Sequence, residues 1–177
     1  MVNERYKRVV VVGRFQPPHL GHVKLIEHAL RVGEKVIIVV GSAQESFSLK
    51  NPLTAGERIE LLERIISARF HDDRDRILII PVMDINMNKV WVQYLRMLLP
   101  RFDAVVTRNP LVAELFKDMG YPVIRQELYH REECSGTRIR ELVVGGGDWT
   151  RCVPSEILEL LEEFDFEGRL RRLSQND

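Results

Sequence analysis

Two histidines placed three residues apart are the first side chains in this sequence whose types and spacing could do chemistry. His19 and His22 enclose Gly21 in a segment that starts at Gly13. Residues three apart at the start of a helix lie on one face, and the helix start adds unpaired N–H donors and a positive dipole end. Gly21 has no side chain, so a bulky ligand could approach the backbone there. We therefore interpret this segment as a phosphate-binding site.

A strand and a helix are expected to hold these histidines in place. Residues 8–12 form a β-branched run that is typical of a buried strand, and residues 19–32 carry apolar side chains at helical spacing. Between them lies Arg14, whose planar guanidinium suits a phosphate. The simpler alternative is an ordinary loop with two incidental histidines, and the combination of residues disfavours it.

The rest of the chain alternates between strand and helix patterns. Strands are predicted at residues 8–12, 35–40, 76–82, 102–107 and 121–125, and helices at 19–32, 54–70, 88–99, 110–119, 136–144 and 154–164. Such alternation predicts an α/β fold, a doubly wound parallel five-stranded sheet with C-terminal helices. Ligands of such sheets bind at the carboxyl ends of the strands, near the switch point, which we place at Gly13. We expect one domain over residues 1–177, with a C-terminal helical extension over about 153–177.

Composition limits the classes of partner. Formal net charge is zero, with 45% apolar and 29% charged residues, so nothing indicates a general surface for nucleic acid or membrane. The apolar runs are too short to cross a bilayer, and we expect a cytoplasmic protein. Cys134 and Cys152 have no metal-ligand spacing, and we interpret them as two free thiols in a reducing compartment. The basic residues 169–172 are interpreted as a solvated tail.

Two common nucleotide-binding signatures are missing from the sequence. It contains neither GxxxxGK[ST] nor GxGxxG, which disfavours P-loop phosphoryl transfer and hydride transfer. The residues present, His19-x-Gly21-His22 after a Gly-x-Phe-x-Pro stretch, resemble the signature of the HxGH nucleotidylyltransferase superfamily. That resemblance implies a Rossmann-like fold and transfer of AMP or CMP to a phosphate-bearing acceptor.

A second motif lies far along the chain. Residues 134–140 read Cys-Ser-Gly-Thr-Arg-Ile-Arg and are similar to the Ile-Ser-x-Thr-x-x-Arg segment that this superfamily pairs with HxGH. Ser135 is a good N-cap, while Thr137 and Arg140 share a face of the helix that follows. Cys134 stands where the family has Ile, and we expect it to pack as a small apolar residue. The helix start and Arg140 together would bind phosphate.

Further residues, at positions 41–46, 51–58, 84–85, 91 and 108–110, resemble the archaeal-type nicotinamide-nucleotide adenylyltransferase family. The resemblance covers roughly residues 8–163. It implies that the substrates are ATP and nicotinamide mononucleotide (NMN), that Mg²⁺ is bound mainly through the ATP phosphates, and that the protein is a homo-oligomer, such as a hexamer. The catalytic residues that it implies are His19, His22, Arg14 and Arg140. Those implied for ATP and phosphate binding are Gly13, Phe15, Gly21, Lys50, Arg108, Asn109, Ser135, Gly136 and Thr137. Those implied for the nicotinamide nucleotide are Ser42, Asp84, Asn88 and Trp91.

Alternatives remain for some of these assignments. Trp91 would stack on the cationic nicotinamide ring, but a tryptophan on an amphipathic helix also suits a core. Asn109 could be a plain helix cap, and Lys50 stands where the family has Arg, which loses a bidentate contact. Other acceptors are phosphopantetheine, flavin mononucleotide, or glycerol phosphate with CTP. A nucleotide-binding sensor without turnover is the alternative outside enzymes.

Overall fold

The five predicted strands form one parallel sheet in the computed structural model, which describes residues 5–126 and 134–175. The strand order is β3-β2-β1-β4-β5. The bounds are β1 (Tyr6–Gly13), β2 (Gly33–Val40), β3 (Ile77–Pro81), β4 (Ala104–Thr107) and β5 (Val123–Arg125). The chain runs outward from β1 to β3 and then returns to place β4 beside β1, in a register that pairs Val9 with Ala104. The order therefore reverses between β1 and β4, and the predicted switch point at the end of β1 is confirmed.

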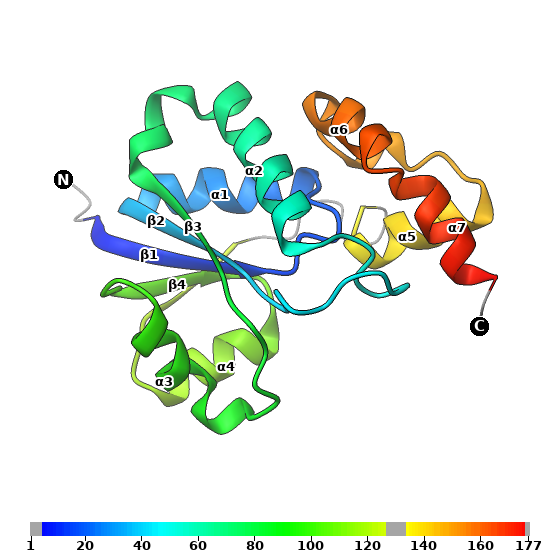
Figure 1. Ribbon diagram of the computed structural model, residues 1–177. Helices are drawn as coiled ribbons and strands as arrows, with labels where there is room; N and C mark the ends of the chain where they lie inside the picture. The colour runs from blue at the N-terminus through cyan, green and yellow to red at the C-terminus, as the bar shows by residue number, and fades with distance from the viewer. Residues whose placement is uncertain (1–4, 127–133, 176–177) are drawn as a thin grey trace.

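Helices cover both faces of this sheet (Figure 1). α1 (Leu20–Val32) and α2 (Ala55–Arg69) lie on one face, and α3 (Asn88–Leu98) and α4 (Pro110–Asp118) lie on the other. Successive strand residues point to opposite faces. Val9 and Val11 accordingly pack with the α1 side, and Val10 packs with the α3 and α4 side. The doubly wound α/β prediction is confirmed.

A third group of helices lies beside α2, at the opposite end of the molecule from the N-terminus (Figure 1). It consists of α5 (Gly136–Gly145), α6 (Leu158–Glu163) and α7 (Phe166–Ser174), with short 3₁₀ turns at Thr150–Cys152 and Ser155–Ile157. These elements share an apolar cluster with α2 that includes Leu61, Ile157 and Leu170. The predicted helix over 154–164 is thus a 3₁₀ turn followed by α6. None of the helices in the described part of the chain is both long and apolar enough to span a membrane.

The interpretation of residues 169–172 as a solvated tail is wrong. These residues lie in α7, where Leu170 is completely buried. Arg169 donates to both carboxylate oxygens of Glu57 at 2.8 Å and to the carbonyl of Pro52 at 3.0 Å. Its guanidinium also lies over the Phe47 ring, 4.4 Å from the centroid. The basic run gave no indication of this, because the pairing joins residues more than a hundred positions apart.

Candidate functional site

The two motif histidines form the N-terminal cap of α1. His19 is the N-cap residue, and its Nδ1 accepts a hydrogen bond from the Gly21 N–H at 3.1 Å. In return, Nδ1 of His22 accepts from the His19 N–H at 3.2 Å. Each imidazole therefore satisfies a backbone donor that the helix start would otherwise leave unpaired.

These hydrogen bonds fix the role of the second ring nitrogen. A neutral imidazole has one acceptor and one donor nitrogen. Because both Nδ1 atoms accept, the proton of each neutral ring is assigned to Nε2 by the hydrogen-bond pattern. The His19 and His22 rings lie side by side, with centroids 3.8 Å apart. The cap thus presents two neighbouring Nε2–H donors at the positive end of a helix dipole.

Both histidines are held neutral by their surroundings. Burial, followed by the nearby charges of Arg108 and Arg140, lowers the pKa of His19 to about 3. Burial likewise holds the pKa of His22 well below its ordinary value, with smaller contributions from His19 and Arg108. Burial disfavours the charged form of an imidazole, and cations beside it act in the same direction. The rings therefore act as neutral donors near pH 7.

A cavity of about 210 Å³ opens over this cap at the sheet switch point. Its lining residues are Val12, Gly13, Arg14, His19, His22, Leu25, Thr107, Arg108, Asn109, Cys134 and Ser135. They come from the ends of β1 and β4, from α1 and from the start of α5. Within residues 5–126 and 134–175, neither Asp nor Glu lines this cavity. Its ionic side chains are arginines, which makes it suited to a polyanion.

Gly21 makes room for one of these arginines. A Cβ added at Gly21 would lie 2.9 Å from both terminal nitrogens of Arg108 and 3.0 Å from the His19 ring. The sequence suggested that this glycine admits a ligand to the backbone. In the structure the same space brings the Arg108 guanidinium against the helix start, beside His19.

The second motif begins α5, as predicted. Ser135 is its N-cap, and its hydroxyl accepts from the Arg138 N–H at 3.1 Å. Arg140 folds back over Gly136 and donates to the carbonyl of Gln16 at 2.8 Å and to the Thr137 hydroxyl at 3.3 Å. Burial and the charge of Arg14 lower the pKa of Arg140 to about 10, with an opposing effect of Glu141, so it remains charged at neutral pH. The hydrogen bond from Arg140 to the Gln16 carbonyl joins the two motifs, which lie far apart in sequence.

Lys50 and Arg140 line a second cavity of about 560 Å³ rather than the first. Its walls also include Leu49, Thr137, Val144 and Leu170. The cavity lies between α5, α7 and the segment that precedes α2. The structure therefore places the predicted phosphate contacts in two cavities, and Arg140, which lines the second, is bonded to the Gln16 carbonyl in the first motif.

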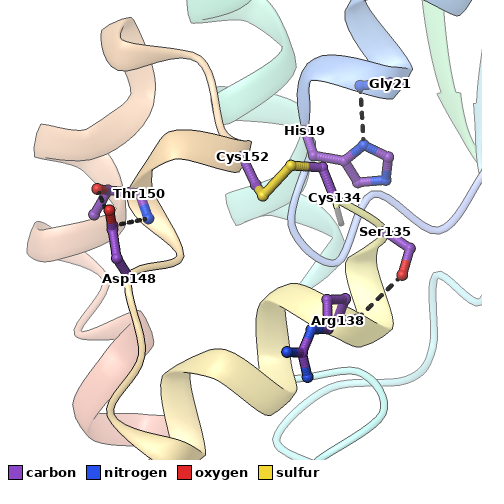
Figure 2. The surroundings of a disulfide bond; sticks show 8 residues. All are labelled: His19, Gly21, Cys134, Ser135, Arg138, Asp148, Thr150 and Cys152. Atoms are coloured by element: carbon purple, nitrogen blue, oxygen red, sulfur yellow. Dashed lines mark hydrogen bonds between the residues drawn. A yellow bond between two sulfur atoms is a disulfide. The ribbon is translucent and has the colours of Figure 1, made fainter. Parts of the chain in front are cut away.

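The prediction that Cys134 and Cys152 are free thiols is wrong. They form a disulfide between the residue before the α5 N-cap and the Thr150–Cys152 turn. Figure 2 shows this bond with His19 on one side and Asp148 and Thr150 on the other. Cys134 also lines the cavity over the α1 cap. Their spacing in sequence carried no such signal, because the turn that carries Cys152 returns to α5 only through tertiary packing.

A buried glutamine that the sequence did not single out joins the site to the Lys50 segment. Gln16 is 2% exposed. Its side chain donates to the Leu53 carbonyl at 2.7 Å and accepts from the Leu53 N–H at 2.9 Å. The backbone carbonyl of Gln16 accepts from Arg140. Gln16 therefore links the first motif both to the second motif, through Arg140, and to the segment before α2, through Leu53. It stands inside the recognised motif, but only the structure reveals that its side chain bonds protein backbone.

The residues predicted for the nicotinamide nucleotide lie around the ends of β2 and β3. The buried Ser42 hydroxyl donates to Asp84 at 2.5 Å, and the Asp84 N–H donates to the Gln44 side chain at 3.0 Å. Asn88 is the exposed first residue of α3. Trp91 is half-buried, with its ring edge-to-face against Phe116 at 6.1 Å. Trp91 is thus partly a core residue and partly open to solvent.

Two further predicted contacts have structural roles. Asn109 caps α4, since its side-chain oxygen accepts from the N–H groups of Leu111 at 2.9 Å and Val112 at 3.4 Å. Asn109 also lines the cavity over the α1 cap, so the same residue caps α4 and contributes to the candidate site. Phe15 is 1% exposed and packs against the His22 ring, with centroids 4.5 Å apart. Its side chain supports the histidine from the core.

Known proteins match this chain over most of its length. Residues 10–142 match the cytidylyltransferase-like family. A nicotinamide-nucleotide adenylyltransferase of Aeropyrum pernix is 54% identical over 96% of this chain and 98% of its own length. One of Archaeoglobus fulgidus with the same name is 42% identical over 96% of this chain and 99% of its own.

A solved structure supports the fold. A Francisella tularensis bifunctional NMN adenylyltransferase/ADP-ribose pyrophosphatase, crystallised with AMP and a manganese ion, superposes with a TM-score of 0.80 at 24% identity. The match covers 96% of this chain and 52% of that protein. The Rossmann-like architecture is therefore shared with a nucleotidyltransferase of low sequence identity.

Proposed function

The chain belongs to the cytidylyltransferase-like family and, within it, to the nicotinamide-nucleotide adenylyltransferases; we propose that it transfers AMP from ATP to the 5′-phosphate of NMN. NAD and pyrophosphate are the products. The observation that carries this proposal is the pair of neighbouring Nε2–H donors on the α1 cap, in a cavity whose ionic groups are arginines. Such an arrangement suits the phosphates of ATP and offers little to a neutral substrate.

The reaction needs alignment more than acid–base chemistry. A 5′-phosphate oxygen of NMN bonds to the α-phosphorus of ATP, while the bond from that phosphorus to the bridging oxygen of pyrophosphate breaks. The nucleophile is already an anion, so no proton has to be removed and no covalent enzyme intermediate is required. The work of the protein is to hold two polyanions in line and to offset charge in the transition state.

Each basic group has a proposed place in that alignment. His19 and His22 donate from Nε2 to the α- and β-phosphates at the start of α1. Arg14, Ser135 and Arg140 bind the β- and γ-phosphates, which become the leaving pyrophosphate. Arg108, packed against Gly21, adds charge beside the same phosphates, and Asn109 lies next to it on the α4 cap. Neutral imidazoles suit this role because they can approach the phosphates without repelling the arginines.

A divalent cation would be carried in by the nucleotide. Within the described residues, no group of three or more His, Cys, Asp or Glu side chains is placed to hold a metal. The cavity lining fits a Mg²⁺ ion bound by ATP phosphate oxygens and water, an arrangement that this ion favours. When bound, Mg²⁺ would neutralise charge on the phosphates as it develops.

The acceptor is proposed to bind at the ends of β2 and β3. Trp91 would offer its exposed part to the positively charged nicotinamide ring, since a cation over an indole face is attracted by the ring quadrupole. Ser42, Asp84 and Asn88 would contact the nucleoside. Lys50, an exposed cation at the second cavity, would attract the acceptor phosphate. This assignment places the two nucleotides on opposite sides of the loop that carries Arg14.

We also propose that the enzyme works as a homo-oligomer. Large apolar side chains on α3 and α4, and at the residue before α3, are exposed: Met97 (77%), Leu111 (52%) and Met87 (60%). A second copy of the chain would cover such a surface. Light scattering coupled to gel filtration would measure the assembly, and a monomer at micromolar concentration would contradict it.

The direct test of function is pyrophosphate release. Purified protein is incubated with ATP, Mg²⁺ and one acceptor at a time: NMN, phosphopantetheine, flavin mononucleotide or, with CTP, glycerol phosphate. We expect rapid release with NMN, and NAD as the second product. Release only with another acceptor would keep the phosphate chemistry and overturn the substrate. ATP binding without release for any acceptor would identify a nucleotide sensor instead.

A further inference from the structure

Arg58 is a buried cation that lies outside both cavities. It stands on the first turn of α2 and is completely buried. Its guanidinium donates to four backbone carbonyl oxygens: those of Gly41 at 2.7 Å, Arg14 at 2.8 Å, Ser42 at 3.0 Å and Thr54 at 3.1 Å. Burying a charge is costly unless its hydrogen bonds are satisfied, and these four carbonyls supply the partners that Arg58 needs.

The carbonyls that Arg58 binds belong to the two halves of the site. Arg14 directly follows β1 and lines the phosphate cavity. Gly41 and Ser42 directly follow β2, and the Ser42 hydroxyl bonds Asp84 on the acceptor side. The five N–H donors of a planar guanidinium suit it to bond carbonyls on several separate segments at once.

The loops that follow β1 and β2 each hold a residue in an unfavourable backbone conformation. Phe15 has a φ of 53° and Ser42 a φ of 49°, the left-handed region that side-chain-bearing residues avoid. Such residues persist only where the surrounding structure enforces them. Arg58 binds the carbonyl of Ser42 itself and the carbonyl of Arg14, the residue before Phe15. The same guanidinium therefore restrains the backbone at both points.

We propose that Arg58 is a positioning residue. It sets the distance and orientation between the cavity that binds the ATP phosphates and the acceptor site at the ends of β2 and β3. The inference rests on the proposed function, because it concerns how two bound nucleotides meet. On the phosphate side, Arg58 acts through the Arg14 backbone and the neighbouring Phe15, whose ring supports His22. On the acceptor side it acts through Ser42 and Asp84. It touches neither substrate.

This role makes a specific kinetic prediction. In Arg58→Lys the charge remains but the fork is lost, so the two loops can shift relative to each other. Each nucleotide still meets its own subsite, while the in-line approach of phosphate to phosphorus is impaired. A misplacement of about 1 Å can cost on the order of a hundredfold in rate. We expect kcat to fall about tenfold or more, with the Kd values of ATP and NMN, each measured alone by calorimetry, within about threefold of wild type.

Arg64→Lys is the matched control. Arg64 lies on the same helix, with a side chain 46% exposed and 3.9 Å from Glu159. We expect wild-type kcat, Kd values and Tm from it. If Arg58→Lys lowers Tm but keeps wild-type kcat at a temperature where it is folded, Arg58 is only a structural residue and the proposal fails. A loss of affinity for one nucleotide that alone explains the rate would also overturn it.

Folding and function are separated by two further measurements. Near-UV circular dichroism establishes whether Arg58→Lys is folded, and if it is not, the neutral Arg58→Gln is measured in the same way. Failure of both to fold would assign Arg58 to the stability of the fold and overturn a positioning role. Absence of pyrophosphate release by the wild type with every acceptor would overturn the proposed function and this inference together. If the wild type releases pyrophosphate and the folded Arg58 variants keep the wild-type kcat, the proposed function stands and only this inference is overturned.

Discussion

The phosphate half and the acceptor half of the proposed site differ in how firmly the protein holds their side chains. In the phosphate half, His19 is buried and His22 is half-buried, and both rings are bonded to the backbone of the helix that they cap. In the acceptor half, Asp84 and Asn88 are exposed, and Trp91 is half-buried. The first arrangement is complete before any ligand arrives, whereas the second is open.

This difference separates catalysis from recognition. Groups that are already oriented stabilise a transition state without a reorganisation cost at the moment of reaction. Exposed side chains on a connection between strand and helix can vary without disturbing the sheet. We therefore expect substitutions in the phosphate half to change kcat and stability, and substitutions in the acceptor half to change the KM of one substrate.

The largest effect is expected from His22→Ala. It removes one Nε2–H donor to the phosphates, and the loss of one such donor costs on the order of 3 kcal/mol in transition-state stabilisation. We expect kcat to fall about a hundredfold or more in the pyrophosphate-release assay while the protein stays folded. His71→Ala, at a side chain 82% exposed, is the matched control. Near-normal turnover by His22→Ala would refute the proposed role of the cap.

Reducing the disulfide, which lies beside the phosphate half, should lower the stability of the protein. Cys134 and Cys152 close a loop of sequence separation 18, and a cross-link of such length stabilises by about 3 kcal/mol. We expect a loss of that order in the free energy of unfolding, measured by denaturant titration with and without reductant. The double variant Cys134→Ser/Cys152→Ala should begin at the reduced value and not respond to reductant. Equal stability of oxidised and reduced wild type would contradict the prediction.

Acidification should destabilise the phosphate half before it affects the acceptor half. The pKa of His19 is about 3 in the folded chain against an ordinary value of 6.5, so between these values the unfolded chain binds the proton more strongly. The stabilisation that comes from this group is complete above about pH 6.5 and is lost as the pH falls towards about 3. The loss of unfolding free energy between pH 7 and pH 5 is about 2 kcal/mol. His22 acts in the same direction.

The variant that isolates this effect is His19→Asn, because asparagine also caps helices. We expect the loss of unfolding free energy between about pH 7 and about pH 5 to be smaller than in wild type by roughly 2 kcal/mol. His71→Asn serves as the exposed control and should follow the wild type. An unchanged pH dependence in His19→Asn would mean that burial of this ring does not govern its protonation.

The sequence predicted the sheet because local signals agreed with the global fold. The valines of β1 are such a signal, and the predicted strand is confirmed. The predicted helix over 54–70 is confirmed as well, and it begins with a capping box of Thr54 and Glu57. The position of the two histidines at the start of a helix was also predicted, since they lie only three residues apart in sequence. Where a feature depends on neighbours along the chain, periodicity and capping rules are sufficient.

Features made by distant residues were not predictable in this way. Three contacts join separate elements: the disulfide, the ion pair of Arg169 with Glu57, and the two hydrogen bonds of the Gln16 side chain with Leu53. Arg58 is an extreme case, because a cation on an amphipathic helix is expected to face solvent. Its burial follows only from the convergence of two loops on the start of α2. Tertiary packing decides such contacts, and one sequence read locally does not contain them.

The smallest effect, and the one that defines the acceptor half, is expected at Trp91. Stacking of a cationic ring on indole contributes about 1 to 2 kcal/mol, so Trp91→Ala should raise the KM of NMN about tenfold while kcat and the KM of ATP stay within about twofold. Trp149→Phe is the control, because Trp149 is buried beside Phe166 in another cluster and should affect only stability. A fall in kcat with an unchanged KM for NMN would show that Trp91 serves the reacting centre, and the division between a catalytic and a recognising half would fail.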